Sequence, residues 1–451
     1  MDSKEPVGSE RPGAPAGTAE LAPWPGFAVA RLPRILFGSG TTGQLGSVVR
    51  EFGRRALVVV RGPGFTDSLD WTRLLVAMET AGVQVDLESV SGEPSPELVD
   101  GIVARHRGSG PSGRSGAVSA PGSNPGSGSA AGPAPIDVVV GIGGGSVLDT
   151  AKAVAGLLVP GNSVMDHLEG VGTQLPYRGP AVPFVAVPTT AGTGSEATKN
   201  AVLSRRGPDG FKKSFRDEML VARVAILDPD LLAACPPELI AANGMDALTQ
   251  LLESYVSTKA NPFTDALALS GLGCVRDGLQ PWFEEAAGRG AAGPSSEAAA
   301  ARERMAYAAL CSGICLAQAG LGAVHGLASP LGAQHPIPHG VACGATLVAA
   351  TRMNIAALEE RDPENRALSR YAVAGWMFSG RAGGDDREAR SALVPALEQL
   401  TAHLGVPRLS AFGLTESSIA ALVADSRGSS MKTNPVVLTD DEIAAILRES
   451  L

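Results

Sequence analysis

The stretch IDVVVGIGGGSVLDTAKAVAGLL (residues 136–158) decides the fold. Its first half is a β-branched run that ends in glycines, and its second half places apolar residues at helical spacing. A strand that leads through glycines straight into a helix is typical of a parallel sheet covered by helices. The bare glycines Gly143, Gly144 and Gly145 let a diphosphate approach the backbone, and the helix N-terminus offers it unpaired N–H groups.

Further strands and helices alternate on both sides of this stretch. Strands are predicted at 55–60, 83–90, 183–190 and 222–229, and helices at 71–82 and 95–107, the latter with Ser95 as its N-cap. From about residue 230 the pattern changes to long Ala- and Leu-rich helical stretches. We therefore expect an α/β domain over 27–229 and an all-α domain over 230–451.

Composition limits the classes of partner. The chain has 451 residues, 44% of them hydrophobic, and a net charge of −9, which argues against nucleic acid and anionic membranes as partners. No membrane span and no secretory signal are expected, because no long apolar run is free of charge or glycine. The tail 1–26 and the Gly/Ser/Pro-rich insertion 108–134 are predicted to be disordered.

The five cysteines form no CxxC pair, so we expect reduced thiols in the cytoplasm. Each of them, at 235, 274, 311, 315 and 343, is interpreted as a small residue of the hydrophobic core.

Two further glycine-rich segments differ in what they predict. The match to G-x-G-x-x-G at Gly38–Gly43 is interpreted as a turn, because the strand at 55–60 is followed by Arg61 and not by an acidic residue. The segment PTTAGTGSE (188–196) follows a predicted strand, and its hydroxyls and glycines suit a nucleotide. Together with the loop at 143–146 it predicts a nucleotide site at the ends of successive strands.

A second set of polar residues predicts a metal site in the helical half. Asp246 and Gln250 are one helical turn apart, and His325 and Ser329 repeat this spacing. His339 follows shortly after, so oxygen and nitrogen donors gather in a short part of the chain. Such donors bind Fe²⁺ or Zn²⁺ when they converge.

These motifs occur in the order seen in the iron-containing (group III) alcohol dehydrogenases, which the chain resembles from about residue 27 to its end, apart from 108–134. The segments that carry the resemblance are GGGSVLDTAKAVA, VPTTAGTGSEATKNAV, GMDALTQLLESYVS and VHGLASPLGAQHPIPHG. The resemblance implies a Rossmann-like dinucleotide-binding domain followed by a helical domain. It also implies NAD(P) and a divalent metal, Fe²⁺ or Zn²⁺, between the domains, a small alcohol or aldehyde substrate, and a homodimer.

The resemblance also assigns cofactor contacts by motif position. These are Gly143, Gly144, Gly145 and Ser146 for the diphosphate, Asp149, Thr189, Thr190 and Thr193 for the nicotinamide side, and Lys212. Members that prefer NAD often carry an Asp where this chain has Arg61, and an arginine can pair with a 2′-phosphate. We therefore favour NADP.

The family's metal ligands, one Asp and three His, fall on Asp246, Gln250, His325 and His339. Gln250 departs from this pattern, and so does Ser329, where the family has a further histidine near the substrate. What remains resembles the three-ligand zinc site of glycerol dehydrogenases, so we expect metal binding that is weakened and less selective. No family role falls on His335, which is interpreted as pocket lining or structural.

The function predicted in this way is reversible hydride transfer between an alcohol carbon and nicotinamide, with Asp246, His325 and His339 holding the metal. Ser329 or water would replace the missing proton-relay histidine. Alternatives remain: a metal-independent keto reductase resembling the maleylacetate reductases, or a nucleotide-binding relative without activity. A lyase resembling the dehydroquinate synthases is disfavoured, because few Lys or Arg residues occur at 246–262 and 325–340.

Overall fold

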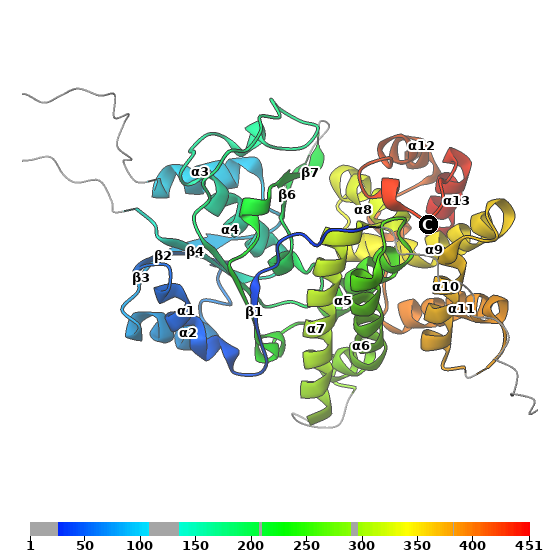
Figure 1. Ribbon diagram of the computed structural model, residues 1–451, viewed down its shortest axis with the longest axis horizontal. Coiled ribbons are helices and arrows are strands. Elements are labelled where there is room, and N and C mark those ends of the chain that lie inside the picture. The colour runs from blue at the N-terminus through cyan, green and yellow to red at the C-terminus, as the bar shows by residue number, and fades with distance from the viewer. Residues whose placement is uncertain (1–25, 108–134, 207–209, 290–295, 382) are drawn as a thin grey trace, which may run out of the picture.

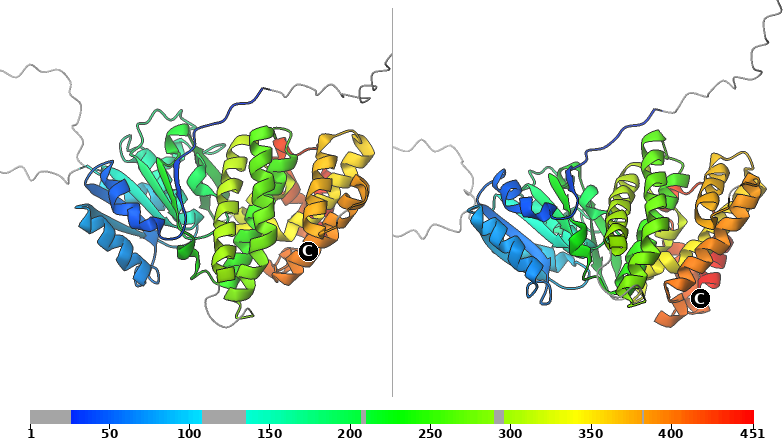
Figure 2. Two further views of the ribbon diagram at one scale, coloured as in Figure 1. Left: turned by 60° about the horizontal axis from the view of Figure 1, so that its bottom comes forward. Right: turned by 90° about the horizontal axis from the view of Figure 1, so that it is seen from below.

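The computed structural model describes residues 26–107, 135–206, 210–289, 296–381 and 383–451. It consists of a sheet-containing part and a helical part that lie side by side (Figures 1 and 2). The insertion predicted at 108–134 and nearly all of the tail predicted at 1–26 lie outside the described residues.

A six-stranded parallel sheet forms the centre of the first part, in the order β1-β8-β5-β4-β2-β3. Its strands are β1 (Arg34–Phe37), β2 (Arg55–Arg61), β3 (Gln84–Val90), β4 (Val138–Gly143), β5 (Phe184–Pro188) and β8 (Val224–Leu227). The central strands are buried on both faces, which explains their continuous apolar sequences. The predicted α/β class is confirmed.

Helices cover both faces of this sheet (Figure 1). They are α1 (Leu45–Arg50) and α2 (Leu69–Thr80) on one face, and α3 (Pro96–His106) and α4 (Gly145–Leu157) on the other. Alternate residues of β2 serve the two cores: Leu57 and Val59 pack towards α3 and α4, and Val58 and Val60 towards α1 and α2. Ser95 caps α3 as predicted, because its Oγ accepts from Leu98 N at 3.2 Å.

An antiparallel hairpin of β6 (Asn200–Arg205) and β7 (Phe211–Arg216) was not predicted from the sequence. Both strands are short, and Lys212, Lys213 and Arg216 hide the apolar side chains of β7 in the sequence pattern. Leu203 and Phe215 pack into the core over α4. The hairpin also brings Lys212 of β7 towards the helical part.

Beyond β8, the described residues form helices and connecting loops but no strand. The α-helices are α5 (Pro237–Val256), α6 (Pro262–Ala286), α7 (Ser296–Ala319), α8 (Ala323–Gln334), α9 (His339–Arg361), α10 (Arg366–Ser379), α11 (Asp386–His403), α12 (Glu416–Asp425) and α13 (Asp440–Ser450). They share one large hydrophobic core. The domain boundary near residue 230 stays a prediction.

Among the described helices, α9 alone has the length and apolar composition that a membrane span needs. Helices α7 and α8 meet the same criteria only when taken together as one broken span. Most of the apolar stretch of α9, 61%, is buried inside the molecule. We therefore interpret α9 as a core helix.

The two parts meet where helix α7 packs against strands β1 and β8 of the sheet (Figure 1). Ala225 and Leu227 of β8 share a small core with Leu310 and Ile314 of α7. The backbones of the two parts come close together where the loop after β5 passes α7, because a Cβ on Gly313 would lie 2.2 Å from the backbone oxygen of Gly194. Only glycine permits this approach.

We therefore expect Gly313→Ala to lower the free energy of unfolding by about 3 kcal/mol or more, since backbone must move to admit the methyl group. Gly273→Ala is the matched control on the neighbouring helix α6, where a Cβ meets nothing within 4 Å. The control should raise stability by up to about 1 kcal/mol. Urea unfolding followed by circular dichroism measures both, and equal stability of the two variants would contradict the close approach.

Candidate functional site

The glycine loop after β4 forms the start of helix α4, as the sequence predicted. Gly144 is the N-cap of α4, with no side-chain cap. A Cβ on Gly144 would lie 3.0 Å from Thr190 Oγ1, and one on Gly145 would lie 2.7 Å from Thr193 Cγ2. These glycines therefore permit close packing between the loops that follow β4 and β5.

The backbone joins the same two loops, because Thr189 N donates to Gly143 O at 3.0 Å. Strands β4 and β5 are parallel neighbours, so both loops lie at one edge of the sheet. Seven predicted cofactor residues meet there: Gly143, Gly144, Gly145, Ser146, Thr189, Thr190 and Thr193. A helix N-terminus beside glycines and hydroxyls suits an anionic ligand.

A buried lysine holds the loop after β5 against α4. Lys152 is 0% exposed, and its Nζ donates to Ser195 O at 2.8 Å, Thr198 Oγ1 at 3.0 Å and Asn200 O at 2.6 Å. Asp149, predicted as a cofactor contact, belongs to the same network, because its Oδ1 accepts from Ser195 Oγ at 2.5 Å. Burial lowers the pKa of Lys152. The structure thus gives Asp149 an internal partner.

Arg61 is exposed at the carboxyl end of β2, next to β4 in the sheet. The segment Gly38–Gly43 forms a turn and a short 3₁₀ helix, in line with the interpretation from its sequence. Two of its N–H groups are already bonded, since the Asp228 carboxylate accepts from Gly40 N and Thr42 N, each at 3.1 Å.

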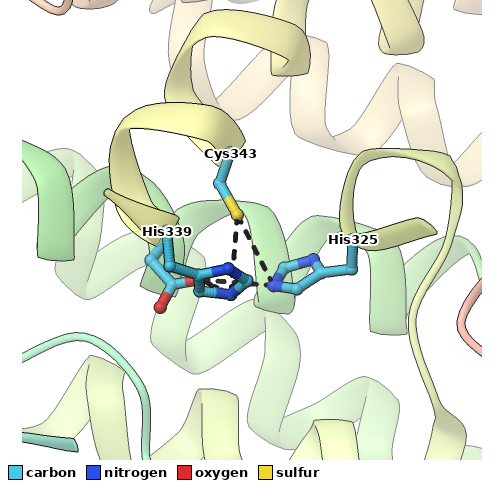
Figure 3. A group of neighbouring side chains, drawn as sticks. His325, His339 and Cys343 are labelled. Atoms are coloured by element: carbon cyan, nitrogen blue, oxygen red, sulfur yellow. Dashed lines mark hydrogen bonds and ion pairs between the residues drawn. The ribbon is translucent and has the colours of Figure 1, made fainter. Parts of the chain in front are cut away.

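Four potential metal ligands converge in the helical part, from α5 (Asp246), α8 (His325) and α9 (His339 and Cys343) (Figure 3). Their ligand atoms all lie within 4.8 Å of one another. Nε2 of His325 is 3.2 Å, and Nε2 of His339 is 3.8 Å, from Oδ1 of Asp246. Three predicted ligands are therefore brought together.

A second carboxylate orients His325. Nδ1 of its ring donates to Glu253 Oε2 at 2.7 Å, and the other Glu253 oxygen accepts from Val324 N at 2.7 Å. This bond leaves Nε2 directed at Asp246. A carboxylate behind a ligating histidine fixes the ring and increases its basicity. The sequence reasoning missed Glu253, although it follows Asp246 by two helical turns.

Burial and neighbouring charges together shift the pKa values of Asp246, His325 and His339. Burial opposes ionisation of Asp246, but the charge of His339 and the bonds to His325 and Gln250 outweigh it and lower its pKa to about 2. Burial likewise opposes a charge on His325, yet Cys343, Asp246 and Glu253 raise its pKa. Burial and then Lys212 lower the pKa of His339 to about 4, so this ring is neutral at pH 7.

The other predicted residues lie around this group. Gln250 is buried, and its Oε1 has no hydrogen-bond partner among the described residues. Ser329 is exposed one helical turn beyond His325. Lys212 pairs with Glu93 at 2.8 Å. His335 is half-buried just beyond the end of α8 and is not part of the group.

Cys343 was interpreted from the sequence as a core residue, and it is indeed buried. The structure also places its Sγ 3.8 Å from Nε2 of His325 and 3.9 Å from Nε2 of His339 (Figure 3). Its spacing of four residues from His339 on one helix was the signal that could have identified it. Carboxylate, imidazole and thiol donors in one buried group fit a divalent transition metal.

Comparison with known proteins gives a consistent result. A family profile described as "Iron-containing alcohol dehydrogenase" matches residues 128–229, and one described as "Fe-containing alcohol dehydrogenase family, C-terminal" matches 240–451. The chain is 35% identical over 317 residues to alcohol dehydrogenase 4 of Schizosaccharomyces pombe, covering 70% of this chain and 69% of that protein. It is 34% identical over 314 residues to long-chain-alcohol dehydrogenase 1 of Geobacillus thermodenitrificans, covering 69% and 74%.

Solved structures share the fold over nearly the whole chain. A 1,3-propanediol oxidoreductase matches with a TM-score of 0.76 and 26% identity, covering 95% of this chain and 100% of that one. Sulfoacetaldehyde reductase from Bifidobacterium kashiwanohense, solved in complex with NAD⁺, matches with a TM-score of 0.74 and 28% identity, covering 94% and 98%.

The buried lysine offers a test of the loop geometry. We expect Lys152→Met to lower the free energy of unfolding by about 3–5 kcal/mol, because it leaves the Asp149 carboxylate and several buried acceptors without their cation. Lys199→Met is the control, since Lys199 forms a partly exposed pair with Glu218 and should change stability by at most about 1 kcal/mol. Chemical unfolding measures both variants, and similar stabilities would show that Lys152 does not hold the loop.

Proposed function

The chain belongs to the family of iron-containing alcohol dehydrogenases, and we propose that it is an NAD(P)- and metal-dependent alcohol dehydrogenase. It would interconvert an alcohol with its aldehyde or ketone. The observation that carries this proposal is the convergence of Asp246, His325 and His339, whose ligand atoms lie within 4.8 Å of one another. Donors of these types, from three helices, suit a catalytic divalent cation.

These three side chains would hold the metal, together with a fourth donor considered below. When bound, the cation would supply Lewis-acid stabilisation of an alcohol or carbonyl oxygen, and the dinucleotide would supply the redox chemistry. Glu253 orients His325 through Nδ1, so that Nε2 faces the group. The Ser329 hydroxyl is exposed one turn away and is our candidate for passing a proton at its Oγ to solvent.

The loops after β4 and β5 would bind the dinucleotide, with the diphosphate on the N-terminus of α4. We propose NADP as the preferred form, because the exposed guanidinium of Arg61 ends β2 at the same sheet edge. Lys212, held by Glu93, would approach the cofactor from β7.

A metal-independent keto reductase is the alternative that uses the same fold. The convergence of a buried carboxylate, two imidazoles and a buried thiol favours the metal-dependent proposal, because donors of these types suit a divalent cation and a buried carboxylate is costly without compensating charge. We also propose a homodimer in the cytoplasm. In support of this location, all five cysteines lie in the described residues and are free.

The metal proposal predicts the outcome of removing one ligand. His325→Ala should lose its bound metal and lower alcohol-dependent reduction of NADP⁺ at least about 1,000-fold, because the cation supplies several kcal/mol of transition-state stabilisation. His335→Ala, on a histidine outside the group, is the control and should keep its metal. Metal analysis and steady-state rates test this together, and undiminished turnover in a metal-free variant would instead support the metal-independent reductase.

The cofactor proposal predicts a change in preference. Arg61→Ala should weaken NADPH binding by about 10- to 100-fold and leave NADH binding nearly unchanged, since only the phosphorylated cofactor loses a charged hydrogen bond. Arg54→Ala, an exposed residue at the opposite end of the strand, is the control. Fluorescence titration with both cofactors measures the difference. Equal loss of both, or of neither, would remove Arg61 from cofactor selection.

A further inference from the structure

Four of the six separations among the ligand atoms of the metal group match the edges of a tetrahedral metal site, and the other two are within 4.8 Å. Metal–ligand bonds of about 2.0–2.3 Å place neighbouring donors in a tetrahedron about 3.3–3.8 Å apart. The measured separations are 3.2 Å and 3.8 Å from Asp246 Oδ1 to the two imidazoles, and 3.8 Å and 3.9 Å from Cys343 Sγ to the same nitrogens. A dication therefore fits between these donors with little rearrangement.

The thiol of Cys343 differs from those of Cys235 and Cys315 in what it faces. Cys235 donates to Thr189 O at 3.3 Å, and Cys315 donates to Thr264 O at 3.5 Å. Sγ of Cys343 instead contacts the nitrogens of His325 and His339 that face Asp246 (Figure 3). Its sulfur is thus aimed at the centre of the group, from the same helix as His339.

Gln250 occupies the position where the family resemblance implies a third imidazole. Its side chain hydrogen-bonds to Asp246. A neutral amide oxygen is a weaker ligand for Fe²⁺ or Zn²⁺ than an imidazole or a thiolate. Gln250 on α5 therefore helps to hold the ligand Asp246 in place, while Cys343 on α9 supplies a sulfur donor.

We propose that Cys343 Sγ is the fourth protein ligand of the metal and compensates for the imidazole that is absent at position 250. This inference rests on the metal site of the proposed function. Binding replaces the S–H bond by a sulfur–metal bond, and the thiol proton leaves to solvent. The resulting set of one carboxylate, two imidazoles and one thiolate neutralises a dication and prefers Zn²⁺ to Fe²⁺.

The test uses the full-length protein, freed of metal by a chelator and loaded with Co²⁺ without oxygen. Wild-type protein should show a near-ultraviolet sulfur-to-cobalt charge-transfer band. Cys343→Ser should lose this band and bind the metal about 10- to 100-fold more weakly. Cys311→Ser, on a buried cysteine of α7 outside the group, should keep both. A wild-type spectrum without the band, or a band that survives in Cys343→Ser, would overturn the proposal.

A second measurement needs no variant. X-ray absorption of zinc-loaded wild-type protein should show one sulfur at about 2.3 Å beside nitrogen and oxygen ligands. Bound zinc with alcohol turnover but no sulfur would exclude Cys343 and leave the proposed function intact. A sulfur ligand without turnover of any alcohol or aldehyde would support the ligand assignment and count against the proposed function.

Discussion

The carboxylate of Asp246 is 1% exposed, and a charge buried to this degree is stable only when neighbouring groups compensate it. Gln250 on the same helix, α5, and His325 on α8 hydrogen-bond to this carboxylate. His339 on α9 lies 3.8 Å from it. The packing of the helical core is thus tied to an electrostatic requirement, because α5, α8 and α9 must keep their spacing for these groups to meet.

A parallel sheet imposes the second constraint, since the carboxyl ends of its strands meet at one edge. Both cofactor loops follow strands that are neighbours in the sheet, although residues 144–183 separate the strands in sequence. Lys152 fixes the second loop from α4, and Gly194 brings the end of this loop against Gly313 of α7. The contact between the two parts of the molecule is therefore built into the same loop as the predicted nucleotide site.

Much of this arrangement could be predicted from local sequence. The strand, the glycine loop and α4 follow from residues 136–158, because β-branched runs, glycines and helical spacing act locally. The hairpin β6–β7 could not be predicted, since the charged side chains of β7 mask the alternation and the hairpin packs against α3, α4 and α8, which are distant in sequence from one another. Among the site residues, Asp246, His325 and His339 could be named from motifs. Glu253 could not, because its role depends on where α8 lies relative to α5.

Cys343 shows why a residue-by-residue comparison of ligands is incomplete. Positions one helical turn apart on α9 face the same volume, so a donor next to His339 can reach the point that position 250 on α5 also approaches. Coordination requires donor atoms at a given distance from the cation and does not specify which helix carries them. A helical site can therefore lose a donor on one helix and retain four ligands through another.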